Sequence, residues 1–234
     1  MVMEVGTAPP LTMPLCSYRE AARALRIPPS TLWWWLEGRI HEGYEPVVRD
    51  AATGNDVVTW GEFVEAAYLR EYRRRSVPLR RLRAFIAALR DEFGLPHPLA
   101  TKRPFIAAGF RLVLELEERA NLAGELRPIV ADPTDGQLVL SYPAEAFLDK
   151  VEFADTADMT ALRWFPAGKR SPVVVDPALS GGAPTVRGIR TEALAELAAD
   201  GLSVSVLADD YGLPEGELRQ ALAYEWGADD LQAA

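Results

Sequence analysis

Residues 17–39 read SYREAARALRIPPSTLWWWLEGR, and this stretch decides the fold expected for the first part of the chain. Ser17 followed three residues later by Glu20 is a capping box, which predicts that a helix begins there. Pro28 and Pro29 cannot continue that helix, but they suit the first turn of a second one. Two short helices separated by a three-residue break are typical of a helix-turn-helix.

The second helix of this stretch contains three consecutive tryptophans. Leu32, Trp35 and Leu36 have the i, i+3, i+4 spacing of one apolar face, so we expect Trp35 to be core. Successive helical side chains point about 100° apart, so the same face cannot also take Trp33 and Trp34. These two indoles either pack under a neighbouring element or line a surface that faces DNA, and the sequence leaves both alternatives open.

The stretch after the tryptophans predicts a hairpin and two longer helices. Residues 46–59, PVVRDAATGNDVVT, contain two β-branched runs around a turn, so we expect a hairpin in the position of a wing. Thr59 and Glu62 form a second capping box, which opens a helix to about Tyr72. Ser76 caps a further helix that ends near residue 94.

Eight arginines and one acidic residue, Glu71, lie between residues 70 and 90. A solvated charged face is the ordinary explanation for such a run. Guanidinium groups also bind phosphate in a bidentate way and release counterions from duplex DNA. Beside a helix-turn-helix and a hairpin, this density favours phosphate contact, for which the candidates are Arg73, Arg74 and Arg75.

The order of these elements resembles the MerR-like winged helix-turn-helix over residues 15–103. The motifs that carry the resemblance are PPSTL, at the start of the second helix, and SVPLRRLRAFIAAL. In that family the second helix lies in the major groove of double-stranded DNA, and the wing also meets the duplex. The resemblance therefore implies further DNA-binding residues, namely Ser30, Thr31, Trp33, Trp34, Arg39 and Arg49.

Residues 104–170 predict a small β-rich middle module. The runs FRLVLELEE, GQLVLSY, LRWFPAG and PVVVDP read as short strands between turn-rich segments, with AEAFLDKVEF as a helix. We expect the module to pack against its flanks or against a second copy of the chain. It contains no nucleophile–base set, and its aspartates lie in turn-like contexts.

Residues 171–226 predict a C-terminal domain of three helices with a second helix-turn-helix shape, opened by Thr191 and Ser203. Residues 171–234 contain 3 basic and 11 acidic groups, which oppose binding to a polyanion. We therefore expect a protein-binding unit that joins two copies of the chain. The last helix offers one apolar face as the interface, with ordinary core as the alternative; its residues are Leu218, Leu222 and Trp226.

The same region resembles the domain of unknown function number 433, through Gly182, Pro184, Gly188, Arg190 and the run GLSVSVLADDYGL. The whole arrangement resembles one type of VapB antitoxin. That resemblance implies a partner toxin, a PIN-domain ribonuclease, and repression of the shared operon, here by the homodimer expected above. An acidic toxin site would be complemented by basic residues, although a solvated turn is the alternative; the candidates are Arg163, Lys169 and Arg170.

The bulk sequence supports an α+β, mainly α chain of 234 residues with tails at residues 1–14 and 227–234. Residues 1–103 have a net charge of +3 and residues 104–234 a net charge of −12, which suggests DNA binding at the front and protein binding at the back. No apolar run would span a membrane and no signal peptide is evident, so we expect a cytoplasmic location.

The residue inventory argues against catalysis. Cys16 is the only cysteine, and His41 and His97 are the only histidines, so we expect no metal site, no cofactor and no enzyme activity. The alternative function is a stand-alone MerR-like regulator whose middle module senses a small molecule.

Overall fold

The computed structural model describes residues 9–39, 42–73, 80–122, 124, 127–131 and 137–226. About half of these residues are helical and the strands form small sheets, so the prediction of a fold that mixes helices and strands is confirmed. Within the described ranges, short 3₁₀ helices also occur at Pro98–Ala100, Arg103–Phe105 and Ser180–Gly182. In the part of the chain that is described, none of the helices is both long enough and apolar enough to cross a bilayer.

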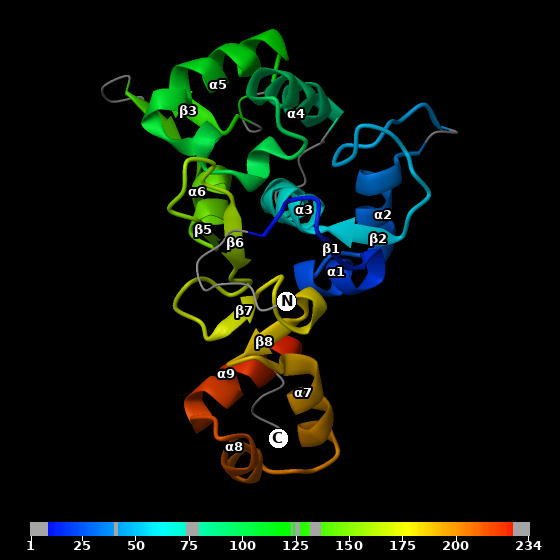
Figure 1. Cartoon of the computed structure of the whole chain (residues 1–234), viewed down its shortest axis with the longest axis vertical. Coiled ribbons are helices and arrows are strands. Elements are labelled where there is room, and N and C mark those ends of the chain that lie inside the picture. Colours follow the sequence, from blue (N-terminus) through cyan, green and yellow to red (C-terminus); the bar gives the residue numbers. More distant parts are fainter. Residues whose placement is uncertain are drawn as a thin grey trace.

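The front of the chain is built around one buried helix. Its elements are β1 (Pro14–Ser17), α1 (Tyr18–Leu25), α2 (Pro29–Glu37), β2 (Val57–Thr59) and α3 (Trp60–Arg73). Both predicted capping boxes are present, because the N–H groups of Glu20 and Glu62 each donate to the hydroxyl three residues earlier, at 3.3 Å. Residues 60–72 of α3 are buried along their whole length, and Figure 1 shows α3 at the centre of the molecule.

The hairpin predicted for residues 46–59 is not formed. Only its second run is a strand, β2, and β2 pairs in antiparallel fashion with β1. The first run is held differently, because the N–H groups of Val47 and Val48 both donate to the carbonyl of Trp35 in α2, at 2.9 Å. The partner that satisfies β2 comes from about forty residues earlier in the chain, which no local pattern reveals.

The middle of the chain is more helical than predicted. Its elements are α5 (Ala107–Arg119), β3 (Ile129–Ala131), β4 (Leu138–Leu140) and α6 (Tyr142–Leu148). The helix predicted to end near residue 94 precedes them as α4 (Arg80–Phe93), and its predicted cap, Ser76, lies outside the described residues. The run FRLVLELEE, predicted as a strand, lies within α5. Val113, Leu116 and Glu117 have the i, i+3, i+4 spacing of one helical face, and all three are buried. Burial of that face explains why the helix is formed.

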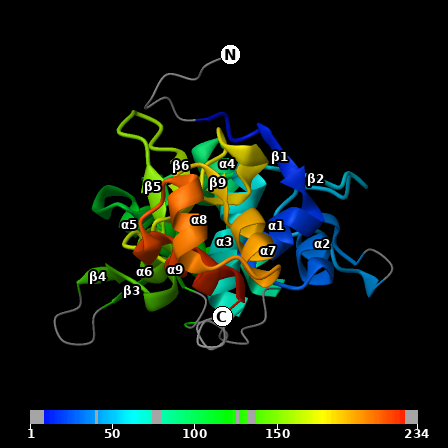
Figure 2. The same cartoon turned by 90° about the horizontal axis from the view of Figure 1, so that it is seen from below.

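A five-stranded antiparallel sheet leads from the middle to the C-terminal part. Its strands follow chain order: β5 (Val151–Phe153), β6 (Ala161–Trp164), β7 (Val173–Val175), β8 (Pro184–Val186) and β9 (Ile189–Arg190). Three helices follow, as predicted: α7 (Thr191–Ala199), α8 (Val204–Tyr211) and α9 (Glu215–Trp226). Figure 1 shows α4 and α5 at one end of the molecule and α7–α9 at the other, and Figure 2 views it from the α7–α9 end.

Two apolar cores meet at β7. The larger core runs from Leu15 to Val175 and includes side chains from α1–α6. The smaller one contains Val173 and side chains from β8 and α7–α9, including Leu218 and Leu222. Because Val173 belongs to one core and Val175 to the other, β7 connects them within three residues.

Glu117 is an acidic side chain inside the larger core. It is fully buried, and its Oε1 accepts a hydrogen bond from the N–H of Ile129 at 2.8 Å. Its Oε2 has no hydrogen-bond partner among the described residues. Burial raises the pKa of Glu117 to about 7, against the smaller effects of the Ile129 N–H and Arg127, which lower it.

We expect Glu117→Gln to stabilise the protein in a pH-dependent way. Between the ordinary glutamate pKa of 4.5 and about 7, the folded protein keeps a proton that the unfolded chain has lost. The stabilising effect of this proton is complete below pH 4.5 and is lost as pH rises to about 7. The gain in the free energy of unfolding should therefore grow by about 3 kcal/mol between pH 4.5 and 7.5, measured by urea denaturation.

The matched control is Glu118→Gln, which changes the exposed neighbour of Glu117. Its effect should stay within about 0.5 kcal/mol at both pH values. A gain for Glu117→Gln that is the same at both pH values would contradict the assignment.

Candidate nucleic-acid interface

The two short helices predicted from residues 17–39 are present as α1 and α2. α1 ends at Leu25, Arg26 takes the left-handed conformation with φ 52°, and α2 begins at Pro29. The N–H of Ile27 donates to the carbonyl of Ala22 at 3.0 Å, which closes the turn. The first residues of α2 are therefore presented at the surface, and Ser30 is exposed.

The three tryptophans of α2 have three different environments. Trp35 is buried, as predicted. Trp33 is half-buried, and its ring packs on that of Tyr18 with centroids 4.8 Å apart. Trp34 is 41% exposed, and the guanidinium of Arg39 lies 3.4 Å from its ring centroid. Trp34 and Arg39 thus form an exposed cation–π pair beside the end of α2.

Of the other candidates on α2, Thr31 is half-buried next to Ser30. The helix ends as predicted at Gly38, where φ is 73°. A Cβ at this position would lie 2.4 Å from the carbonyl oxygen of Tyr44, so a larger residue does not fit. Next to this close approach, the N–H of Arg39 donates to the carbonyl of Tyr44 at 2.7 Å.

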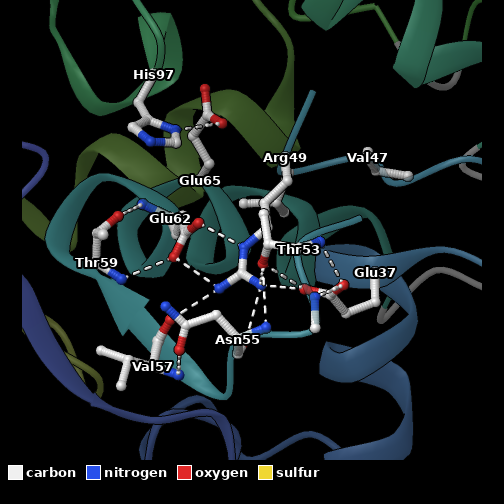
Figure 3. Close-up of polar contacts among 12 residues, drawn as sticks. Glu37, Val47, Arg49, Thr53, Asn55, Val57, Thr59, Glu62, Glu65 and His97 are labelled. Carbon is white, nitrogen blue, oxygen red and sulfur yellow. Dashed lines mark hydrogen bonds and ion pairs between the residues drawn. The ribbon is translucent and has the colours of Figure 1, made fainter. Parts of the chain in front are cut away.

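Arg49 is not part of the exposed surface, which corrects the prediction that it contacts DNA. Its side chain is buried, and its Nε donates to Glu62 Oε1 at 2.7 Å (Figure 3). Its Nη1 bonds to Glu37 Oε1 and donates to Thr53 Oγ1 at 2.8 Å. Its Nη2 donates to the carbonyl of Val57 at 2.8 Å. Each nitrogen of the guanidinium donates to a partner within the protein, so no donor is available for a phosphate.

The carboxylates around Arg49 are equally occupied. Glu37 Oε2 accepts hydrogen bonds from the N–H groups of Thr53 and Gly54, both at 2.7 Å. Burial alone would raise the pKa of Glu37, but these two N–H groups, and then Arg49, outweigh it and lower the pKa below the ordinary value. Glu62 Oε2 accepts the N–H of Thr59 at 2.7 Å. We call these three side chains, Arg49, Glu37 and Glu62, the Arg49 network.

Arginines of α4 hold the same segment from its other side. Arg83 Nε donates to the carbonyl of Pro46 at 2.8 Å. Arg90 forms ion pairs with Asp50 at 2.8 Å and with the buried Glu65 at 3.2 Å. These two members of the basic run are therefore structural ties to residues 45–50.

The rest of the basic run divides in two. Arg70 is buried in α3, with Nη1 3.5 Å from Glu71 Oε1. Arg74, Arg75 and the side chains of Arg73, Arg80 and Arg81 lie outside the described residues. The contact of Arg73, Arg74 and Arg75 with phosphate therefore stays a prediction.

The predicted protein interface at the C-terminus needs a correction. Leu218 and Leu222 are fully buried in the smaller core, against α7 and α8, and Trp226 packs on the same core. The alternative, ordinary core, is the one observed. Among the predicted toxin contacts, Arg163 pairs with Asp176 at 2.7 Å, and Lys169 donates to the carbonyl of Leu148 at 3.2 Å.

Sequence reasoning missed the acidic members of these networks, Glu37, Glu62 and Glu65, as partners of arginine. Glu62 was found only as half of a capping box. The described residues contain no group of three His, Cys, Asp or Glu side chains placed to hold a metal ion.

We expect Arg49→Gln to destabilise the protein by at least about 3 kcal/mol, because two buried carboxylates lose their cation. Arg39→Gln is the matched control, since it removes a more exposed arginine that pairs with Glu42 at 3.1 Å, and should cost at most about 0.5 kcal/mol. Urea denaturation measures both. An Arg49→Gln protein with unchanged stability and weakened DNA binding would contradict the structural role.

Most of the chain is similar in sequence to known proteins. Residues 173–224 match the family described as a protein of unknown function, DUF433. The uncharacterized protein Rv2308 of Mycobacterium tuberculosis (strain ATCC 25618 / H37Rv) is 31% identical over 225 residues, which cover 88% of each chain. A protein of the same strain named "Putative antitoxin VapB45" is 29% identical and aligns over 90% of this chain and 93% of its own length.

A solved structure shows the same architecture. The crystal structure of Rv2018 from Mycobacterium tuberculosis matches with a TM-score of 0.71 and 29% identity, over 90% of this chain and 98% of that one. The likeness therefore extends through the α1–α2 unit, the middle and the DUF433 region. At 31% identity over nearly its full length, the chain belongs to the same protein family as Rv2308.

Proposed function

We propose that this chain is the antitoxin of a bacterial type II toxin–antitoxin pair, which binds a toxin and represses the shared operon. The observation that carries the proposal is the near full-length likeness to the protein named "Putative antitoxin VapB45". The partner is proposed to be a PIN-domain ribonuclease, as the resemblance seen in the sequence implies.

The proposed DNA-binding unit is α1–α2 with the segment that follows it, in a MerR-like arrangement. Its hydrogen-bond donors are the exposed hydroxyl of Ser30 and the partly exposed guanidinium of Arg39, and its aromatic face is the exposed ring of Trp34. Residues 51–57 are exposed and are anchored beside α2 by the Arg49 network, so they take the place of a wing without forming a hairpin. The basic run from Arg73 to Arg75 would add phosphate contacts.

The proposed protein-binding unit is the acidic C-terminal part. Since Leu218 and Leu222 are core, its contact surface has to be elsewhere. Three apolar side chains are exposed around α8: Leu202 just before the helix is 36% exposed, Val206 in its first turn 46%, and Tyr211 at its end 40%. Exposed apolar side chains of this kind favour an interface with a second copy.

We expect Arg39→Gln to weaken binding to a duplex from the promoter of its own operon by about tenfold at moderate salt. The slope of log affinity against log salt should fall by about one, because one phosphate contact is lost. Fluorescence anisotropy measures both quantities. Arg73→Ala combined with Arg74→Ala should flatten the slope further.

Arg103→Gln provides the control for this experiment. It removes the same charge from a site where the guanidinium pairs with Asp158 at 3.1 Å, away from α2. Equal losses for Arg39→Gln and Arg103→Gln would reduce the effect to overall charge and count against α2 as the reader.

We expect Val206→Asp to shift the protein from dimer to monomer, because two-fold symmetry places the new charge in the interface twice. Light scattering after size exclusion measures the mass. Val139→Asp on β4, where the side chain is 36% exposed, is the matched control and should leave the mass unchanged. A Val206→Asp protein that stays dimeric would assign the interface to another surface.

Failure to co-purify with the product of the adjacent gene would contradict the antitoxin proposal.

A further inference from the structure

A cleft of about 470 Å³ opens where the turn after α1, α3, the loop before β7 and helix α9 meet. Three arginines from three of these elements line it: Arg26, Arg70 and Arg170. Ser171 and Gln220 add uncharged polar groups. No aspartate or glutamate is among its described lining residues.

Arg26 lies at one edge of the cleft. Its guanidinium is 4.2 Å from the ring centroid of Tyr224, and no described carboxylate forms an ion pair with it. Arg26 has φ 52°, a left-handed conformation that costs a non-glycine residue about 1 kcal/mol. Glycine or asparagine is usual at such a helix end, so the arginine side chain is retained at some conformational cost.

The side of the cleft formed by Tyr224, next to Arg26, is held in place by a hydrogen bond. The phenol of Tyr224 in α9 donates to the carbonyl of Ala24 in α1 at 3.0 Å. Burial raises the pKa of Tyr224 to about 12, although Arg26 acts in the opposite direction, so the phenol stays a neutral donor at neutral pH. The first and last helices of the described chain are thereby held together beside the cleft.

Positive charge is in excess around the cleft. Arg70 is buried, and its Nη1 lies 3.5 Å from Glu71 Oε1. Arg170 is exposed and forms no ion pair with a described carboxylate. Three guanidinium groups thus line a cleft that has no carboxylate among its described lining residues, and their mutual repulsion would be relieved by an anion.

We propose that this cleft binds a phosphate dianion, either free or as the end of a small phosphomonoester. Guanidinium groups bind phosphate oxygens in a bidentate way. The Oγ of Ser171 accepts the N–H of Val173 at 3.3 Å, which leaves the hydroxyl hydrogen for a ligand, and Gln220 brings an amide donor. The ligand would join the α1–α2 turn to α9. This site goes beyond the proposed antitoxin function and does not depend on it.

The test is thermal unfolding of the full chain in increasing sodium phosphate or glycerol 3-phosphate, with sodium chloride at the same ionic strength as reference. The expected result is a saturable rise in Tm with one or both phosphates and none with chloride. A larger effect of glycerol 3-phosphate would identify a phosphomonoester site, and a larger effect of phosphate a free-ion site. A rise that does not saturate would mean general salt stabilisation and would overturn the proposal.

Arg170→Gln is the decisive variant, because it removes an exposed cation from the cleft with little risk to folding. It should weaken phosphate binding by at least about tenfold. Lys169→Gln removes the same charge from the adjacent residue, which does not line the cleft, and should keep wild-type affinity. Equal losses in the two variants would overturn the proposal.

Gln220→Glu gives a test in the opposite direction. A carboxylate placed among the three arginines should raise the Tm in the absence of phosphate by several degrees and abolish the phosphate-dependent rise. A wild-type response to phosphate in this variant would contradict the site. Displacement of bound phosphate by a promoter duplex would assign the cleft to DNA instead and would also overturn the proposal.

Discussion

The buried ion pairs of Arg49 are the constraint on which the front of the molecule depends. One guanidinium joins Glu37 at the end of α2 to Glu62 at the start of α3, and the same carboxylates hold the backbone of Thr53 and Thr59. Removing charges from water is costly, and this arrangement is stable only because each one has its full set of partners. The position of the exposed face of α2 relative to residues 51–57 follows from these contacts.

A second constraint lies between the two cores. β7 contributes Val175 to the larger core and Val173 to the smaller one, and Tyr224 ties α9 to the backbone of α1. Exposed ion pairs between Arg23 and Glu192 and Glu225 lie along the same boundary but contribute little by themselves. The α1–α2 unit and the DUF433 region are therefore connected through buried contacts.

Sequence patterns predicted the features that local interactions decide. Both capping boxes, the stripe on α2 and the stop at Gly38 depend on residues within one turn or helix, and all are observed. Features decided by distant partners were missed. β2 pairs with β1, and FRLVLELEE alternates like a strand but buries a helical face against other elements. Leu218 was predicted to lie at an interface, with ordinary core as the alternative, and it is buried in the core formed with α7 and α8.

The number of arginines overstates the positive charge that is available for the proposed contact with DNA. Of the eight arginines between residues 70 and 90, Arg70 is buried, while Arg83 and Arg90 bind backbone carbonyls and acidic side chains of the protein itself. Arg49 is also consumed internally. A buried guanidinium whose donors are all engaged by the protein releases no counterion from a duplex, so the cations available for the proposed DNA contact are fewer than the arginine count suggests. Recognition would then depend more on the shape of the exposed α2 face and its indole than on a broad electropositive surface.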